Sequence, residues 1–191
     1  RRSMGLRERV MLILRSSDAQ RISFSITGAS GSAITVNGAM LGQVAQAIED
    51  GTITVQSGGV GDGWAKYSAR AEGSDAANTL YVGTNNTGSR DFAGLIVHEA
   101  VQAAFDLART TIPWIDNEVV AYIAQGYYYR NSGFRTSRMD PLGMPYLGRM
   151  IVDDIRSGGD AGDFWIGELR ASLLADPTYH SYIRGTFTGD G

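Results

Sequence analysis

The segment from residue 91 to 108 constrains this fold most strongly, because it is apolar on nearly all sides and yet carries polar side chains in its middle. A helix that is apolar around most of its circumference is buried in a protein core. His98, Glu99 and Gln102 would then be buried as well, and an isolated charge in such a place is strongly disfavoured. The fold must therefore bring polar partners to this helix.

Glu118 is the first candidate partner. It follows His98 by 20 residues and lies on a second helix that the spacing predicts from 115 to 129. Two antiparallel helices joined by residues 109–114 would place the Glu118 carboxylate over the first helix. The sequence therefore predicts a helix pair, 91–108 and 115–129, whose polar side chains meet.

The spacing within the first helix is suited to holding one ion. His98 and Gln102 are four residues apart, so their side chains leave the same helix face about 6 Å from each other. Two groups at this separation can bind one metal ion. Glu99 lies beside them, about 100° further around the helix.

These residues resemble the active site of zincin metallopeptidases of the gluzincin type. Such enzymes carry H-E-x-x-H on one helix and E-x-x-A on the next. Here residues 98–102 read HEAVQ and residues 118–121 read EVVA, preceded by Asn117 as the N-E pair often is in that family. The resemblance covers roughly residues 91–129, and the strands expected before it are similar to the small sheet of the family.

The resemblance implies a role for each residue. His98 and Glu118 would be zinc ligands, and Glu99 would be the general base that activates a metal-bound water for peptide hydrolysis. Gln102 stands where the second histidine ligand would be. A neutral amide oxygen is a weaker zinc donor than imidazole, so we expect zinc to bind weakly, or not at all unless Gln102 is compensated. The expected function is that of a degenerate or weakly active metallopeptidase, with a peptide or protein as substrate or partner.

Two alternatives stay open. A non-catalytic binding or structural domain derived from a metallopeptidase would join His98, Gln102 and Glu118 in a hydrogen-bonded cluster without an ion. An active zinc peptidase would need an unusual ligand set, for which His180 is the only other histidine. A single histidine in a polar, aromatic segment is more often a surface or packing residue. Asp106 is two turns from His98, so we expect it to orient a neighbour rather than bind metal.

Two further groups of residues have an ordinary explanation beside a functional one. The tyrosines of the second helix and of the segment near 180 offer phenolic donors for an oxyanion, but three consecutive tyrosines point in three directions and most must serve packing. The glycine-rich stretch 58–63 lacks the Lys and Ser/Thr of a phosphate loop. We interpret it as a connection between strands.

The rest of the pattern predicts an α+β fold with a small antiparallel sheet packed against a helical half. Alternation predicts a hairpin over 21–36 and strands over 52–56, 64–71 and 78–83. Helical spacing predicts further helices over 6–19, 40–49, 146–156 and 163–174. A turn over 85–89 leads into the long helix, with Ser89 or Asp91 as its cap. We expect one domain spanning residues 1–191.

Composition excludes several classes of function. The chain has 17 Lys and Arg against 20 Asp and Glu, a net charge of −3, so no basic field attracts nucleic acid or anionic membranes. The absence of cysteine excludes disulfides, thiolate metal sites and thiol nucleophiles. The apolar run 10–14 is too short for a membrane span or a signal-peptide core, so we expect a soluble chain. Its compartment stays open.

Overall fold

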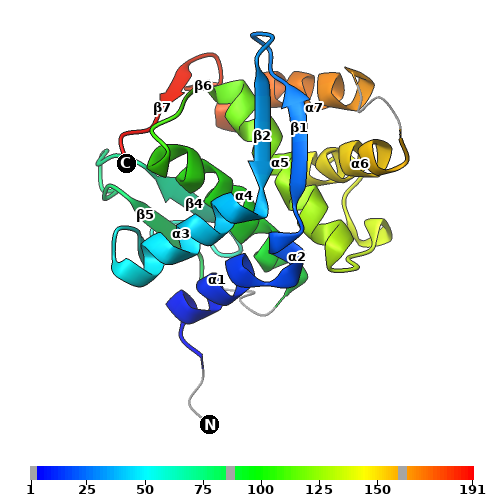
Figure 1. The fold of residues 1–191 in the computed structure, drawn as a ribbon. Helices are drawn as coiled ribbons and strands as arrows, with labels where there is room; N and C mark the ends of the chain where they lie inside the picture. The colour runs from blue at the N-terminus through cyan, green and yellow to red at the C-terminus, as the bar shows by residue number, and fades with distance from the viewer. Residues whose placement is uncertain (1–3, 85–88, 159–162) are drawn as a thin grey trace.

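The computed structural model describes residues 4–84, 89–158 and 163–191, and in these ranges the chain has an α+β fold (Figure 1). The helices are α1 (Leu6–Arg15), α2 (Ser17–Gln20), α3 (Gly38–Asp50), α4 (Arg90–Leu107), α5 (Trp114–Asn131), α6 (Met144–Arg156) and α7 (Asp163–Ala175). The strands are β1 (Ser23–Thr27), β2 (Ala33–Asn37), β3 (Thr54–Ser57), β4 (Ala65–Ser68), β5 (Thr79–Val82), β6 (Thr111–Pro113) and β7 (Thr186–Thr188). Two 3₁₀ helices are η1 (Thr136–Arg138) and η2 (Pro177–Tyr179).

Most predicted elements are confirmed, with one helix divided. The helix expected over 6–19 breaks at Ser16, whose backbone is extended and whose hydroxyl accepts a hydrogen bond from Ala19 N as the cap of α2. Ser89, one of the two expected caps of α4, accepts from Phe92 N through its hydroxyl. Residues 85–88 of the predicted turn lie outside the described ranges.

The three central strands differ from the expected antiparallel sheet. Their order is β3-β5-β4, and β3 pairs with β5 in parallel, with Thr54 opposite Thr79. Only β4 and β5 are antiparallel. The cause lies in the connection 58–63, which carries the chain past the central position of the sheet, so that β5 later enters between the two earlier strands. As a result β4 is an edge strand.

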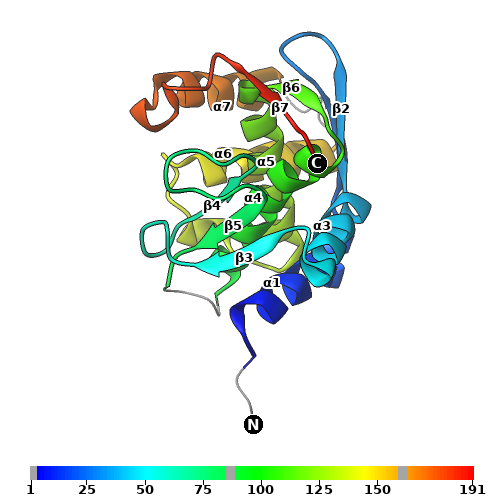
Figure 2. The same ribbon diagram turned by 90° about the vertical axis from the view of Figure 1, so that its left-hand side faces the viewer.

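Two antiparallel pairs complete the strands. The hairpin β1–β2 places Phe24 opposite Val36, as the alternation predicted. The pair β6–β7 was not predicted, and it joins Ile112 to Phe187 across a long separation in the chain. This second pair lies beside the carboxyl end of α4 (Figure 2).

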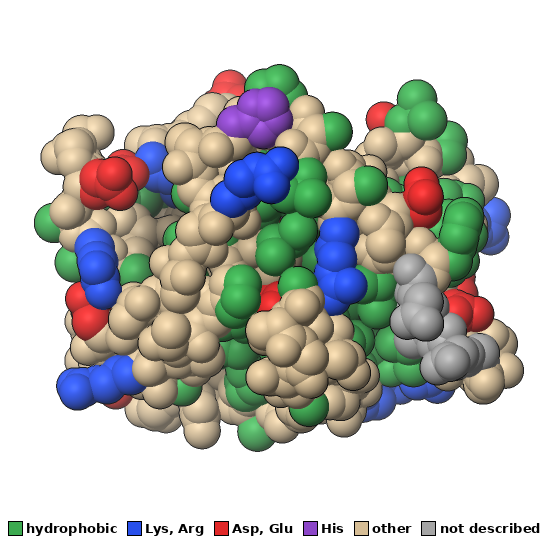
Figure 3. Space-filling view, turned by 90° about the horizontal axis from the view of Figure 1, so that it is seen from above, with side chains coloured by type: hydrophobic (Ala, Val, Ile, Leu, Met, Phe, Trp, Pro, Cys, Tyr) green, Lys and Arg blue, Asp and Glu red, His purple; other side chains and the backbone are tan. Residues whose placement is uncertain are grey.

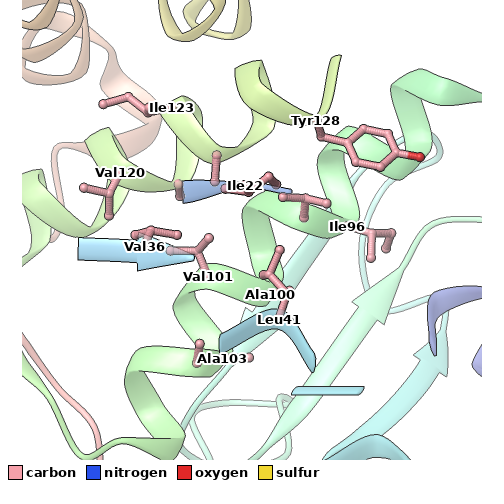
Figure 4. Close-up of a cluster of buried hydrophobic side chains, with 14 of the residues drawn as sticks. Ile22, Val36, Leu41, Ile96, Ala100, Val101, Ala103, Val120, Ile123 and Tyr128 are labelled. Carbon is pink, nitrogen blue, oxygen red and sulfur yellow. The ribbon is translucent and has the colours of Figure 1, made fainter. Parts of the chain in front are cut away.

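α4 and α5 occupy the middle of the molecule, with the three-stranded sheet and α3 on one side and α6 and α7 on the other (Figures 1 and 2). The apolar core fills the space between this helix pair, the hairpin β1–β2 and α3 (Figure 4). Val36, Val101 and Val120 are fully buried there. The side of the helix pair that faces the hairpin and α3 is therefore apolar, and the polar side chains of the pair lie on other faces.

α6 is held unusually close to α5 by two glycines. A Cβ added at Gly126 would lie 2.6 Å from the carbonyl carbon of Gly148, and one at Gly148 would lie 2.2 Å from the carbonyl oxygen of Tyr122. The backbones therefore touch where these helices cross, and α6 adds Leu147, Ile151 and Val152 to the apolar core. In the described ranges, no helix combines the length and the apolar character that crossing a membrane requires.

Candidate functional site

The candidate site is the polar part of the interface between α4 and α5. On α4, Asp91, His98 and Gln102 follow each other at spacings of seven and four residues, so they share one face. On α5, Glu118 and Gln125 are seven residues apart and share the face turned toward α4. The two helices thus bring together two polar stripes, which are buried in an otherwise apolar core except at Asp91, where the α4 stripe reaches the surface.

A glycine allows the helices to approach at one end of these stripes. A Cβ at Gly94 would lie 2.3 Å from Cε1 of Tyr129, which no side-chain adjustment of a buried ring could relieve. Tyr129 is 1% exposed and its hydroxyl reaches the Asp91 carboxylate at 3.0 Å. The contact fixes the register of α5 along α4, and with it the position of the polar side chains.

Glu118 is the centre of the cluster. Its Oε1 accepts hydrogen bonds from Gln102 Nε2 at 2.7 Å and from the Tyr182 hydroxyl at 3.3 Å. Its Oε2 lies 3.1 Å from His98 Nε2. Glu118 is only 4% exposed, and three donors around one carboxylate satisfy the hydrogen-bonding needs of this buried charge.

Both ring nitrogens of His98 face oxygen atoms that can accept a hydrogen bond. Nδ1 lies 3.1 Å from Gln125 Oε1, and the orientation of that amide is fixed because Gln125 Nε2 donates to the Tyr129 hydroxyl at 2.8 Å. Tyr129 in turn donates to Asp91 Oδ1. With an amide oxygen on one side and the Glu118 carboxylate on the other, the ring is an imidazolium.

The charge of His98 follows from two opposed effects. Burial lowers its pKa. The hydrogen bond to Glu118 and the charges of Glu118 and Glu99 together raise the pKa by more than burial lowers it, so the net shift is upward. The ring is 5% exposed and packs edge-on against Tyr122, with centroids 4.4 Å apart. A buried ion pair therefore stands at the position where the resemblance places a metal.

Glu99 is held apart from this ion pair by the sheet. Its Oε2 accepts from the backbone N–H of Tyr67, on β4, at 2.8 Å. Burial raises the pKa of Glu99 to about 7; the charge of Glu118 raises it as well, while His98 and the Tyr67 N–H oppose the shift. Glu99 therefore exchanges a proton near neutral pH.

Asp106 fixes the strand that holds Glu99. The Tyr67 hydroxyl donates to Asp106 Oδ2 at 2.6 Å, and the backbone N–H of Asp190 donates to Oδ1 at 3.0 Å. Asp106 is fully buried and does not contact His98 through these bonds. It orients a neighbouring side chain, the role expected from its place two turns along α4.

The tyrosines divide between the cluster and the core. Tyr122 hydrogen-bonds the Tyr179 hydroxyl, and burial raises the pKa of Tyr122, Tyr179 and Tyr182. These three phenols therefore stay protonated and can donate toward the Glu118 side of the site. Tyr127 instead stacks on Phe24 in the apolar core.

A groove opens next to the cluster, between the edge strand β4 and the strand β7. Its volume is about 310 Å³. Residues 66–70, Glu72, Asp75, Gln102, Trp114 and residues 186–188 line it. Arg70 spans it, because its guanidinium donates to the Thr188 carbonyl at 3.1 Å and lies 3.4 Å from the Asp190 carboxylate. Gln102, which donates to Glu118, and Tyr67, which donates to Glu99, thus connect the buried cluster with the groove.

The donor set at this place does not fit a zinc ion. Within the described ranges, no group of three or more His, Asp or Glu side chains is arranged to hold a metal. The Gln102 amide presents its N–H group, a donor, to Glu118, and turning it over would set two oxygens against each other. His180, the suggested substitute, is exposed, and its Nε2 lies 3.1 Å from the Leu174 carbonyl.

The sequence predicted some members of this site but not others. His98, Gln102 and Glu118 converge as expected, and Glu99 lies beside them. Gln125 was missed, although its position seven residues after Glu118 places both on one face of α5. The Tyr67 N–H and Tyr182 could not be found by helical spacing, since both reach the site from other elements.

Comparisons with known protein families, with curated proteins and with solved structures found no match to this chain. The interpretation of the site therefore depends on its own geometry and chemistry.

Proposed function

We propose that this protein is a degenerate, zincin-like metallopeptidase relative that binds an extended peptide in the groove beside Gln102 without cleaving it. One observation carries the proposal: Glu118 is already satisfied by the Gln102 amide and the His98 ring, at 2.7 and 3.1 Å. The His98 imidazolium supplies the positive charge that a metal ion would otherwise place beside Glu118. A site closed in this way keeps its shape without an ion.

The position of Glu99 supports the absence of hydrolysis. A general base must lie within hydrogen-bond reach of the water that it activates. The Glu99 carboxylate is instead 8% exposed and is bound to the Tyr67 N–H. Releasing it would break one of the two hydrogen bonds by which Tyr67 joins the edge of the sheet to α4. This arrangement favours a structural use of the three residues over a catalytic one.

The surroundings of the helix pair support a zincin-like architecture. An antiparallel pair carries the two motif segments, and a small mixed sheet packs on α4 with β4 at its edge. Among the described residues, one side of β4 has no neighbouring strand, so the backbone groups on that side other than the Tyr67 N–H, which donates to Glu99, are open to an extended chain. We infer the architecture from this arrangement and from the motif spacing together.

The groove has the chemistry of a peptide-binding surface. Three of the four charged side chains that line it are paired: Lys66 Nζ lies 2.9 Å from Asp75, and Arg70 pairs with Asp190, next to the groove. Trp114 adds an apolar wall and packs edge-on against Phe187. A surface that combines strand edges, an aromatic wall and neutralised charges favours an extended polypeptide over a strongly charged ligand.

Zinc binding distinguishes this proposal from an active enzyme. The chain with Gln102 and its Gln102→His variant are stripped with chelator and then titrated with zinc while the melting temperature is followed. The variant has three candidate ligands and should gain stability, about 2.7 kcal/mol at zinc concentrations a hundredfold above its Kd. The original chain should not respond. Tight zinc binding by the original chain would contradict the proposal.

Peptide binding is tested by filling the groove. An unbiased library of extended peptides is screened by calorimetry, and each bound peptide is checked by mass spectrometry for cleavage. Ala69→Trp should abolish binding because Ala69 lines the groove, whereas Ala171→Trp, on the exposed face of α7, should leave it unchanged. Circular dichroism confirms that both variants fold. Peptide cleavage, or equal binding by both variants, would overturn the proposal.

A further inference from the structure

A second cavity, of about 560 Å³, lies at the amino end of α4. It is lined by Ser89, Arg90, Gly133, Phe134, Arg135 and Arg138, so it joins the start of α4 to the segment between α5 and η1. Arg90 closes one side, because its NH1 donates to the Gly133 carbonyl at 3.2 Å. The proposed peptide groove uses none of these residues.

The charge of this cavity is unusual for the molecule. Arg90, Arg135 and Arg138 are exposed, and within the described ranges none of the three pairs with a carboxylate. The neighbouring Arg130 and Arg149 behave differently, since both pair with Asp153, at 2.5 and 3.1 Å. On the face viewed from above in Figure 3, basic and acidic side chains are interspersed. Three unpaired guanidinium groups around one cavity contrast with a chain whose net charge is −3.

The helix itself adds to the positive potential. α4 has 18 residues, and its first turn presents backbone N–H groups and the positive end of the helix dipole toward this cavity. The acidic residue of that turn, Asp91, is engaged on the other side, because its Oδ1 accepts from the Tyr129 hydroxyl. Phe134, in tilted contact with Tyr129 at 4.9 Å between centroids, forms an apolar wall.

We propose that this cavity binds a small, multiply charged anion that carries phosphate or sulfate groups. Arg90, Arg135 and Arg138 would be its ligands, since guanidinium groups bind such oxyanions through paired, charge-assisted hydrogen bonds. The volume is that of a small-molecule site and exceeds what one tetrahedral anion needs, so the ligand carries a second group. The site is independent of the proposed peptide groove.

Calorimetry with inorganic pyrophosphate and with inorganic sulfate, at low salt, tests the site. Pyrophosphate should bind more tightly than sulfate, and added KCl should weaken both. In the double variant Arg135→Gln/Arg138→Gln the affinity for pyrophosphate should fall by about tenfold or more, which equals about 1.4 kcal/mol. The matched control is Arg156→Gln/Arg184→Gln, which removes two exposed arginines that do not line the cavity. It should bind as the original chain does.

Three results would overturn the proposal. One is the absence of measurable pyrophosphate binding by the original chain. Another is an equal loss of affinity in the two double variants, because binding would then depend only on net charge. The third is Arg135- and Arg138-dependent retention on phosphatidylglycerol vesicles without binding of pyrophosphate, which would make the cavity part of a lipid-binding surface.

Discussion

Charged side chains are paired and buried at the middle of α4, whereas those at its amino end are exposed. In the middle, the buried His98 and Glu118 complete each other, and Gln102 and Gln125 use the hydrogen bonds that are left. At the amino end, three exposed arginines face a cavity without carboxylate partners in the described ranges. A buried charge needs an opposite charge within the chain because it has lost its contact with water. An exposed charge is solvated, so it can stay unpaired until a ligand binds. The motif that resembles an enzyme is thus the closed region, and the open region lies where the sequence has no motif.

Removing the central carboxylate should have the largest effect. Glu118→Ala leaves His98 without its counter-charge and takes the acceptor from Gln102 and Tyr182. Breaking a buried ion pair on one side costs about 3–5 kcal/mol, and urea denaturation should show this loss in the free energy of unfolding.

Glu49→Ala is the matched control for that variant. Glu49 forms an exposed pair with Arg15, at 2.6 Å, and its side chain is 51% exposed. Such pairs contribute less than about 1 kcal/mol. If both variants lost the same stability, the buried pair of His98 and Glu118 would contribute no more than an exposed ion pair.

Stability should also fall as the pH rises through neutrality. Glu99 has a pKa of about 7 in the folded chain against its ordinary 4.5, so between these values folding takes up a proton and raising the pH destabilises the fold. His98 acts in the same direction: its raised pKa contributes stability below its ordinary value of 6.5, which is lost at higher pH. Urea denaturation between pH 5 and pH 8 measures the slope.

Glu99→Gln separates the two groups. The amide oxygen can still accept from the Tyr67 N–H but no longer ionises. At pH 8 the variant should be more stable than the original chain, by at most on the order of 3 kcal/mol, and the pH slope that remains belongs to His98. An unchanged slope would show that Glu99 is already ionised in the folded chain at pH 5.

The smallest effect is expected at the open region. Arg135→Gln/Arg138→Gln should change the free energy of unfolding by less than about 0.5 kcal/mol, because both side chains are exposed and pair with no carboxylate in the part of the chain that the structure describes. Pyrophosphate should raise the melting temperature of the original chain and not that of the variant. A large loss of stability without ligand would show that these arginines support the fold instead.

The sequence predicted the helix pair well because its signals are local. Apolar spacing and the Ser89 cap act within one helix, and the 20 residues from His98 to Glu118 span only two consecutive helices and their short connection. The polar cluster was predicted as far as those spacings reach, and Gln125 lies on the same face of α5. Burial of His98 in an apolar helix also required a partner, and Glu118 is that partner.

What the sequence could not predict depends on contacts between distant segments. The parallel pairing of β3 with β5 is decided by which strand enters the sheet last, and alternation carries no information on this order. The strands β6 and β7 have three residues each, too few for a periodic signal. The arginine cavity needs Arg90 beside Arg135 and Arg138, which the path of α5 and the loop after it brings together.

The pairing of β7 with β6 has a consequence for biosynthesis. β7 follows the other strands and helices of the described residues, and it provides one wall of the groove beside Gln102. A ribosome therefore delivers the helix pair and its ion pair long before the groove has its second side. Until β7 is synthesised, the β4 side of the groove stays uncovered, so a chaperone or a peptide could bind it before the second side of the groove forms.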